Sequence, residues 1–553
     1  MPSNGATALR LAWTTTLLVL IGVVALQWHA ASLLLGSSLQ GDEAKHFTSG
    51  VMVYDYLRSG FTLKPIPFAE QFEVRYPLVA IGQWPPMYYA IQAVFYFVAG
   101  PFIRSAQVLS ALMAVTFASL IFLGLKADVG VRVALIAAGV FLAAPLMQGA
   151  AWQVMSDLLT GLFVYLAIAA FAKVLDAPGN KMSALAFAAY AVAAILSKGS
   201  AWALAPFFLF APILSRRAGF FRSRWFMGTI VIVVLFGSAF YLFAARLGIG
   251  YPMFLSYFLS LGIKTRWLTV EQVLAFAPAS MLVIGVIGAL IAIHARWWLN
   301  DQTHRTSLSL VAAAWVASQI VFLAILPMTR EPRVMLPALA PLAVLAAGTM
   351  RSLQRVVRQE PVFAAVVPAI LGGIILAGSL SAGTYRVDGF RRAADAMPYP
   401  SDGALILVAT NKWGGEEELI SERLSHDRAH KDVILRGSHV LADLSLEEMG
   451  EEPLFDSADA VRNYLLQMPV RFVVLSSPPY QYSFQALIDA AVAGDPQDFH
   501  LVAQVPIVVR PSGTILHELR IYENPAGRDR HPDVVQTRLG SIGGRRILEY
   551  RWK

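Results

Sequence analysis

The chain has 553 residues, of which 57% are hydrophobic and 14% are charged, and its formal net charge is +8. A soluble globular protein carries roughly 25% charged residues, so this chain has too little polar material to cover a water-exposed surface. The bilayer is therefore the expected solvent. The sequence contains no cysteine, which excludes a disulfide framework and a thiolate metal site.

Long apolar runs along the chain predict an α-helical polytopic membrane protein. A membrane helix needs about 20 mostly apolar residues, and on that criterion the sequence offers about eleven candidate spans. They lie near residues 11–35, 105–125, 132–150, 157–173, 182–198, 199–215, 225–245, 275–295, 308–327, 335–350 and 362–382. The first run is longer than the roughly 7–15 apolar residues of a signal peptide, so we interpret it as an uncleaved helix. A shorter run, 86–100, predicts an interfacial or re-entrant helix.

Basic residues gather in alternate loops between these candidate spans. If the N-terminus is inside, every inner loop is basic, as the positive-inside rule requires. The residues are Lys126, Arg132, Lys173, Lys181, Arg216, Arg217, Arg222, Arg224, Arg296, Arg305, Arg351, Arg355 and Arg358. The pattern predicts a multi-pass membrane protein with a cytoplasmic N-terminus, and the membrane that we expect is a bacterial inner membrane. It also accounts for much of the positive charge without nucleic acid.

Three segments are predicted on the outer side: the loop 36–104, the loop 246–276 and the region 383–553, which follows a transmembrane domain at 1–382. The last region is rich in charge and alternates strand-like with helix-like stretches. The strand-like runs are Ala404–Ala409, Val433–Leu435, Arg471–Leu475, Leu501–Val509 and Ile515–Tyr522, and the helix-like stretches are Glu416–Ser425, Ala458–Gln467 and Tyr482–Ala493. This alternation predicts a soluble, extracytoplasmic α/β domain. Because its sequence contains neither a phosphate-cradling glycine loop nor a nucleophile elbow, we interpret it as an accessory domain.

Two adjacent carboxylates, Asp42 and Glu43, follow the first apolar run, with His46 one turn later. Charge at the mouth of a membrane helix is costly and often functional. Val51, Tyr54 and Leu57 recur at helical spacing further along, which predicts an amphipathic helix on the outer surface. The carboxylates therefore have two interpretations: they serve catalysis, or they only favour the positive N-terminal end of that helix.

A double proline separates Gln83 and Trp84 from Tyr88 and Tyr89. The prolines stop one segment and set the entry of the next. The aromatic side chains are interpreted either as an interfacial belt or as a wall against which a sugar stacks.

Four further charged residues are predicted at the same outer level. Asp157 begins the fourth span, where a carboxylate can simply cap a helix. Lys198 lies between two spans, where snorkelling is the plain explanation. Arg330 and Arg333 oppose the positive-inside trend and need a local reason, which is either anion binding or pairing with Glu331.

The order of these elements along the chain carries a resemblance. The elements are Asp42-Glu43, Pro85-Pro86-Met87-Tyr88-Tyr89, Ser156-Asp157, Ser197-Lys198-Gly199 and Glu331-Pro332-Arg333-Val334-Met335-Leu336-Pro337. This order resembles the polyprenyl-phosphate-dependent membrane glycosyltransferases of the C-type fold. The similar group is that of the protein O-mannosyltransferases and lipid A aminoarabinose transferases, glycosyltransferase families 39 and 83. The resemblance covers about residues 10–380. Two positions depart from the family pattern. Trp84 stands where the family commonly has Lys or His, and Val334 stands where it has Tyr, so no particular sugar is implied.

The resemblance implies that a sugar moves from a polyprenyl phosphate to an acceptor hydroxyl at the outer face of the membrane. Asp42 is then the general base of an inverting displacement, and Glu43 and Asp157 are further carboxylates of the catalytic site. The cations that meet the donor phosphate are Lys198, Arg330 and Arg333. The residues that face the sugar or the acceptor are His46, Gln83, Trp84, Tyr88 and Tyr89.

The expected partners are a polyprenyl-phosphate sugar donor, membrane lipids and an acceptor that is a lipid, a glycan or a protein. No cofactor is expected, and a divalent metal at converging carboxylates is the less favoured alternative. The main competing function is a transporter or lipid flippase, which more often shows broken helices at mid-membrane depth and repeated halves. Here the polar residues gather at one outer level and the sequence has no evident repeat. A third candidate function is a non-catalytic membrane scaffold that presents the C-terminal domain, but it leaves the clustered charges at the outer level unexplained.

Overall fold

The computed structural model describes residues 41–79, 82–246, 279–325, 332–356, 386–411, 415–427, 429–444, 451–510, 512–528, 530–538 and 547–552. The predicted helices 11–35 and 362–382 lie outside the described residues. So do the loop 247–278, which holds most of the predicted outer loop 246–276, and the residues Arg330 and Glu331.

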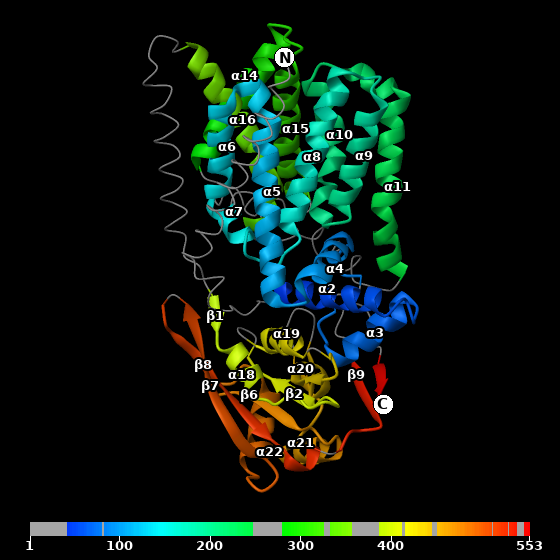
Figure 1. The fold of residues 1–553 in the computed structure, drawn as a ribbon, viewed down its shortest axis with the longest axis vertical. Coiled ribbons are helices and arrows are strands. Elements are labelled where there is room, and N and C mark those ends of the chain that lie inside the picture. Colours follow the sequence, from blue (N-terminus) through cyan, green and yellow to red (C-terminus); the bar gives the residue numbers. More distant parts are fainter. Residues whose placement is uncertain are drawn as a thin grey trace.

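A bundle of apolar helices forms one end of the molecule (Figure 1). Its elements are α5 (Ile103–Val129), α6 (Val131–Ala143), α7 (Pro145–Ala150), α8 (Asp157–Asp176), α9 (Lys181–Ile195), η1 (Gly199–Ala203), α10 (Leu204–Leu214), η2 (Ala218–Arg222), α11 (Arg224–Arg246), α14 (Ala279–Trp297), α15 (His304–Ile325), η3 (Pro332–Met335) and α16 (Leu336–Val356). Within the described residues, five helices are long and apolar enough to cross a membrane: Ile103–Val129, Asp157–Asp176, Arg224–Arg246, Thr306–Ile325 and Arg333–Leu353. The chain is therefore a membrane-embedded helical protein, and the count of eleven spans stays a prediction.

Two of the predicted spans are not continuous helices. The run 132–150 is divided between α6 and α7, because Ala144 has the extended backbone that a residue before proline prefers (ψ 132°). The run 199–215 begins with the 3₁₀ turn η1 before α10 starts at Leu204. In both places an even apolar composition concealed a local change of backbone geometry.

Three helices cross the end of the bundle that faces the C-terminal region (Figure 1). They are α2 (Asp42–Arg58), α3 (Pro65–Arg75) and α4 (Met87–Ala99). The first and last correspond to the predicted amphipathic helix and the predicted interfacial helix. Helix α3 was not predicted. It starts with Pro65 in the first helical turn, where the absence of an amide proton costs nothing.

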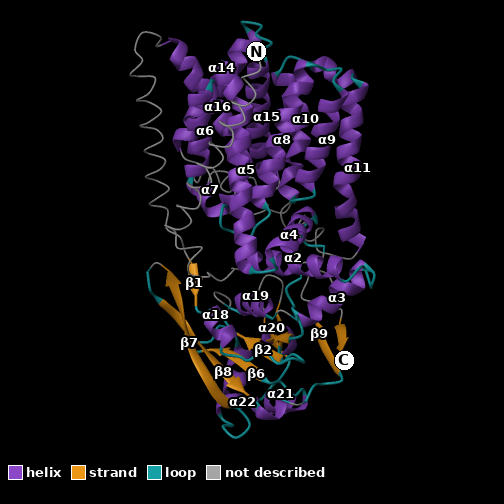
Figure 2. Ribbon diagram, viewed as in Figure 1, coloured by secondary structure: helices purple, strands orange, loops and turns teal. Residues whose placement is uncertain are grey.

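The C-terminal region is built on a mixed sheet within the described residues (Figure 2). Its strand order is β1–β7–β8–β6–β2–β3, with β2 parallel to β3 and β6 and the other pairs antiparallel. The elements are β1 (Arg386–Asp388), α18 (Phe390–Asp395), β2 (Leu405–Ala409), α19 (Glu416–His426), β3 (Val433–Arg436), α20 (Gly437–Val440), β4 (Ala442–Leu444), β5 (Glu451–Pro453), α21 (Ala458–Gln467), β6 (Phe472–Ser476), α22 (Ser483–Ala493), β7 (His500–Arg510), β8 (Ile515–Glu523), η4 (Pro525–Gly527), β9 (Val534–Arg538) and β10 (Ile547–Arg551). All five predicted strands and all three predicted helices are present. The short pairs β4–β5 and β9–β10 were not predicted.

Alternate residues of β2 enter two different hydrophobic cores, as the period of a strand requires. Leu405 and Leu407 join α21 and α22 on the face remote from the bundle. Ile406 and Val408 face the bundle, where they share a core with α19 and with Phe47 of α2. The helix that begins at the predicted catalytic carboxylates therefore packs in the same core as the C-terminal sheet.

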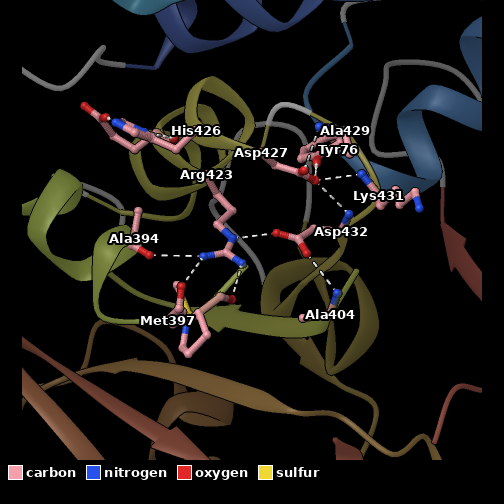
Figure 3. Close-up of polar contacts among 12 residues, drawn as sticks. Tyr76, Ala394, Met397, Ala404, Arg423, His426, Asp427, Ala429, Lys431 and Asp432 are labelled. Carbon is pink, nitrogen blue, oxygen red and sulfur yellow. Dashed lines mark hydrogen bonds and ion pairs between the residues drawn. The ribbon is translucent and has the colours of Figure 1, made fainter. Parts of the chain in front are cut away.

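A buried arginine ties together the layer between the sheet and the bundle (Figure 3). Arg423 Nε donates to Asp432 Oδ2 at 2.5 Å, and its Nη atoms donate to the carbonyl oxygens of Ala394, Met397 and Pro398 at 2.6–3.1 Å. Both charged side chains are almost fully buried. This single guanidinium thus provides hydrogen bonds to the carbonyl oxygens at the end of α18. It also holds Asp432, the residue that directly precedes strand β3.

We expect Arg423→Met to destabilise the C-terminal domain by about 3–5 kcal/mol, because it leaves the Asp432 carboxylate buried without its partner. The exposed pair Arg391–Asp395, at 3.8 Å, provides the control. Arg391→Met should cost less than about 1 kcal/mol. Thermal unfolding of the purified protein measures both effects. Equal, small losses in the two variants would show that the buried network does not hold this layer.

A second expected result concerns pH and the glutamate Glu422 on α19. Burial raises the pKa of this carboxyl to about 8, and the charges of Arg391 and Arg104 only partly oppose the shift. The folded protein therefore keeps a proton that the unfolded chain releases near the ordinary value of 4.5, so this group's contribution to stability falls as pH rises between those two values. Glu422→Gln should match the unsubstituted protein near pH 5 and unfold at a higher temperature at pH 8. Parallel unfolding profiles against pH would contradict the assignment.

Candidate functional site

The first turn of α2 presents the carboxylate of Asp42 to the end of the helical bundle. A carboxylate is favoured there because the N-terminus of a helix carries partial positive charge. Arg333, on the 3₁₀ turn η3 that leads into α16, donates from Nη2 to Asp42 Oδ2 at 2.7 Å. Its Nη1 lies 3.4 Å from the sulfur of Met155. The pair remains accessible, with Asp42 35% and Arg333 21% exposed.

The pKa of Asp42 lies below its ordinary value of 3.8. Burial pushes the pKa upward, but the charge and hydrogen bond of Arg333 outweigh it, with a further contribution from Lys45. Asp42 is therefore an ionised and partly exposed carboxylate at neutral pH. That is the protonation state that a general base needs.

The neighbouring carboxylate of Glu43 is placed differently. Its side chain is buried, and Oε1 accepts a hydrogen bond from the backbone N–H of Val154 at 2.9 Å. Val154 precedes α8 by only a few residues. Glu43 thus fastens the start of α2 to the segment that delivers Asp157, and this fixes the position of Asp42 relative to the bundle.

A second ion pair joins Asp157 to Lys198. Asp157 is the first residue of α8 and is 3% exposed, while Lys198 lies between α9 and η1 and is 16% exposed. Lys198 Nζ lies 2.7 Å from both carboxylate oxygens of Asp157. Met87 N, at the start of α4, donates to the carbonyl of Leu196 at 3.0 Å. The predicted aromatic element is therefore attached to the segment that carries Lys198.

His46, one turn into α2, is buried against the three predicted aromatic residues. Its ring centroid lies 4.4 Å from that of Trp84, 5.5 Å from Tyr88 and 5.7 Å from Tyr89. Nδ1 is 3.0 Å from the Tyr89 hydroxyl, and Nε2 is buried with no hydrogen-bond partner among the described residues. Gln83, just before Trp84, is half-buried.

The two ion pairs both act electrostatically on His46. Burial lowers the pKa of His46 to about 3, and the charges of Asp42 and Asp157, which raise it, are countered by Lys198 and Arg333. His46 is therefore neutral at physiological pH and is a poor proton acceptor. The same interactions show that the two ion pairs lie around one residue of α2, as the sequence analysis expected from their shared outer level.

The C-terminal domain also reaches this region, which the sequence analysis did not foresee. Lys45, one turn after Asp42, pairs with Glu417 at the start of α19 at 3.2 Å. Arg436, at the end of β3, holds Glu416 at 2.8 Å and Glu417 at 3.6 Å. The only sequence signal was the run of three glutamates from Glu416, which does not reveal its partners. The arrangement braces α2 from the side opposite to the bundle.

The structure therefore brings together nine of the predicted site residues and the half-buried Gln83 beside them, whereas Arg330 lies outside the described residues. The nine are Asp42, Glu43, His46, Trp84, Tyr88, Tyr89, Asp157, Lys198 and Arg333. In the described part of the chain, no group of three or more His, Asp or Glu side chains is arranged to hold a metal ion. The chemistry that these residues offer is an ionised carboxylate, two cations and an aromatic wall.

The bundle, the crossing helices and the C-terminal sheet together define a membrane-embedded protein with the C-type glycosyltransferase fold. ArnT from Cupriavidus metallidurans, solved with undecaprenyl phosphate bound, matches with a TM-score of 0.56 and 13% sequence identity, over 93% of this chain and 99% of ArnT. The apo structure of the same protein matches with a TM-score of 0.54 and 14% identity, over 94% and 100% of the two chains. An oligosaccharyltransferase from Archaeoglobus fulgidus matches with a TM-score of 0.47 and 11% sequence identity, over 90% of this chain and 72% of the oligosaccharyltransferase.

No protein-family model and no curated protein sequence matches the chain. At the identities above, the likeness to ArnT is one of fold, and it confirms the fold that the order of motifs predicted. It also extends further than those motifs. The resemblance was expected to cover residues up to about 380, whereas the structural match covers 93% of the chain and so includes much of the C-terminal domain.

Proposed function

We propose that this protein transfers a sugar from a polyprenyl phosphate to an acceptor hydroxyl. The observation that carries the proposal is the convergence of an accessible Asp42–Arg333 pair and a buried Asp157–Lys198 pair around His46. A lipid-linked phosphate needs cations, and an attacking hydroxyl needs a base. Both are present at one end of a bundle whose fold is that of an enzyme solved with undecaprenyl phosphate.

In the proposed reaction, the acceptor oxygen bonds to the anomeric carbon of the sugar while the bond from that carbon to the phosphate oxygen breaks. Asp42 takes the hydroxyl proton, and the leaving group departs as polyprenyl phosphate. One displacement of this kind inverts the anomeric configuration. The transferred sugar is a hexose or a pentose derivative.

Arg333 has a double role in this scheme. In the structure its Nη2 donates to Asp42, and this bond helps to hold the pKa of the carboxyl low. A phosphate that engages the same guanidinium, which suits bidentate contact, removes that bond. The pKa of Asp42 then rises, so the carboxylate becomes a stronger base when the donor arrives.

The other residues of the site act on the substrates or on the geometry. Lys198 adds a second cation for the phosphate and is held by Asp157, which we propose as the second carboxylate of the cavity. Trp84, Tyr88 and the half-buried Gln83 face the sugar or the acceptor together with His46 and Tyr89. Glu43 positions Asp42 through the backbone of Val154. Arg330 is proposed to meet the phosphate on sequence grounds alone.

We further propose that the protein resides in a bacterial inner membrane with the site on the outer face. The N-terminus is then cytoplasmic, residues 1–382 form the transferase domain, and residues 383–553 form a periplasmic domain. The distribution of basic residues supports this orientation. The acceptor is a lipid, a glycan or a protein at that face.

The proposal is tested with purified protein in vesicles, supplied with a lipid extract whose polyprenyl-phosphate sugars are radiolabelled in the sugar. We expect the label to leave the lipid phosphate and to appear on an acceptor, with mass spectrometry identifying the polyprenyl phosphate released. A parallel arm contains only labelled nucleotide sugar. Transfer only in that arm, or movement of intact lipid-linked sugar across the vesicle bilayer without transfer, would contradict the proposal, and the second result would favour a flippase.

A further inference from the structure

At the opposite end of the bundle from the sheet, an open cavity of about 800 Å³ is lined by the end of α14, the 3₁₀ turn η2 and the loops that follow α8, α10 and α14. Its lining includes three arginines, Arg216, Arg217 and Arg296, and no carboxylate side chain. The other lining residues are Pro178, Gly219, Phe220, Ser223, Asn300 and Gln302. Three like charges around one space repel one another unless something anionic occupies it.

Arg296 shows that this cavity is built into the fold. It is 4% exposed, and its Nε and Nη1 donate to the carbonyl oxygens of Ser215 and Asp301 at 2.9 and 3.0 Å. Those neutral carbonyls orient the guanidinium without cancelling its charge. A fully charged group this deeply buried is normally paired.

The other two arginines are held in the same way. Arg217 Nη2 donates to the side-chain oxygen of Gln302 at 3.1 Å, and Arg216 Nη1 donates to the carbonyl of Trp297 at 2.8 Å. Throughout the part of the chain that the structure describes, none of the three lining arginines forms an ion pair with a carboxylate. Arg216 also adopts a left-handed backbone (φ 51°), an uncommon conformation for a long side chain, of the kind that collects at binding sites.

The nearest carboxylates are engaged elsewhere. Asp301 accepts hydrogen bonds from Thr303 N at 2.9 Å and from Thr306 Oγ1 at 2.7 Å. Asp176 is bonded to His304. Both carboxylates reduce the positive potential of the region, but neither lines the cavity. The inward charge therefore remains that of the three guanidinium groups.

We propose that this cavity is a binding site for a phosphate group, and that the group is the headgroup of an anionic membrane lipid. Guanidinium groups match phosphate oxygens in charge and in fork geometry. The lipid source is favoured because Trp297, Trp298 and Leu299, which follow Arg296 directly, are exposed apolar side chains, as expected where a helix end meets the lipid interface. The site lies at the far end of the bundle from Asp42 and is separate from the proposed transfer of sugar.

The test uses the full-length protein in detergent and native mass spectrometry, with phosphatidylglycerol, phosphatidylcholine and inorganic phosphate as separate probes. We expect phosphatidylglycerol to remain bound, and the double variant Arg216→Gln/Arg217→Gln to reduce its occupancy at least about tenfold. Phosphatidylcholine should bind much less. The control is Arg222→Gln/Arg224→Gln, which removes the same charge from two nearby exposed positions, the last residue of η2 and the first of α11, that do not line the cavity.

Each outcome decides the proposal. Equal losses in the two double variants would mean attraction by charge alone and would overturn the site, as would wild-type occupancy in the first variant. Binding of inorganic phosphate that displaces the lipid, and that is lost only in Arg216→Gln/Arg217→Gln, would support the phosphate site with a soluble anion as its ligand. Binding of phosphatidylglycerol, with neither of the other two probes bound, would support a lipid headgroup as the ligand of the site.

Discussion

Asp42→Asn is expected to reduce sugar transfer by about 10²–10⁴-fold, the usual contribution of a general base. The amide keeps the shape of the side chain and a hydrogen-bond acceptor for Arg333, but it cannot take a proton from the acceptor hydroxyl. Because Arg333 is 21% exposed, the loss of its charge partner should change stability little. Transfer rates at saturating donor, together with thermal unfolding, measure the two effects.

Asp395→Asn is the matched control for this variant. Asp395 is an exposed aspartate of α18 whose contact with Arg391 is long, at 3.8 Å, and it should leave transfer unchanged. The pH profile adds a second criterion. The pKa of Asp42 lies below 3.8 in the free protein. The kcat/KM for the donor, which reports the ionisation of the free protein, should therefore stay high in acidic solution. Full activity of Asp42→Asn would remove Asp42 as the base.

Lys198→Met is expected to produce the second large effect, on stability and on donor use together. Removing the cation leaves the Asp157 carboxylate, only 3% exposed, without its partner, at a cost of about 3–5 kcal/mol. The variant alone therefore cannot separate a structural role from phosphate binding. The double variant Asp157→Asn/Lys198→Met can, because it removes the uncompensated charge and should recover most of the stability.

In that double variant, donor binding should stay at least about tenfold weaker than in the unsubstituted protein if Lys198 meets the phosphate. Lys181→Met provides the control, since Lys181 begins α9 at the far end of the bundle, where its ammonium lies 5.0 Å from the Trp225 ring centroid. Titration with the lipid-linked donor and thermal unfolding are the two measurements. Wild-type donor affinity in the double variant would assign the Asp157–Lys198 pair to structure alone.

The helices and strands were largely predictable because their patterns are local. The strand Leu405–Ala409 is an unbroken apolar run, as expected of a parallel strand that is buried on both faces. The break at Ala144 and the helix that begins at Pro65 were missed because a single proline decides each of them, while the surrounding composition stays the same. The hairpin formed by β9 and β10 lies in a polar stretch with little apolar alternation, so nothing in its composition marked it.

The candidate site was predictable as a set of residues but not as a set of contacts. Asp42 and Arg333 are 291 positions apart, and only the tertiary structure reveals that they form a pair. Only the family resemblance favoured Asp42 over its neighbour Glu43 as the base. Adjacent side chains on a helix point in different directions, and the sequence alone does not show which one faces the site. Their separation into an exposed carboxylate and a buried anchor on Val154 required the tertiary structure.

Because α2 and the C-terminal sheet bury their side chains in one core, the region from residue 386 onward is not an interchangeable module. Phe47 and Val51 of α2 lie in the same cluster as Ile406 of β2, so a chimera joined between the bundle and the sheet would have to carry α2 and α3 with the incoming sheet. A substitution on the inner face of β2 therefore reaches the helix that carries Asp42 through the core that both elements share with α19.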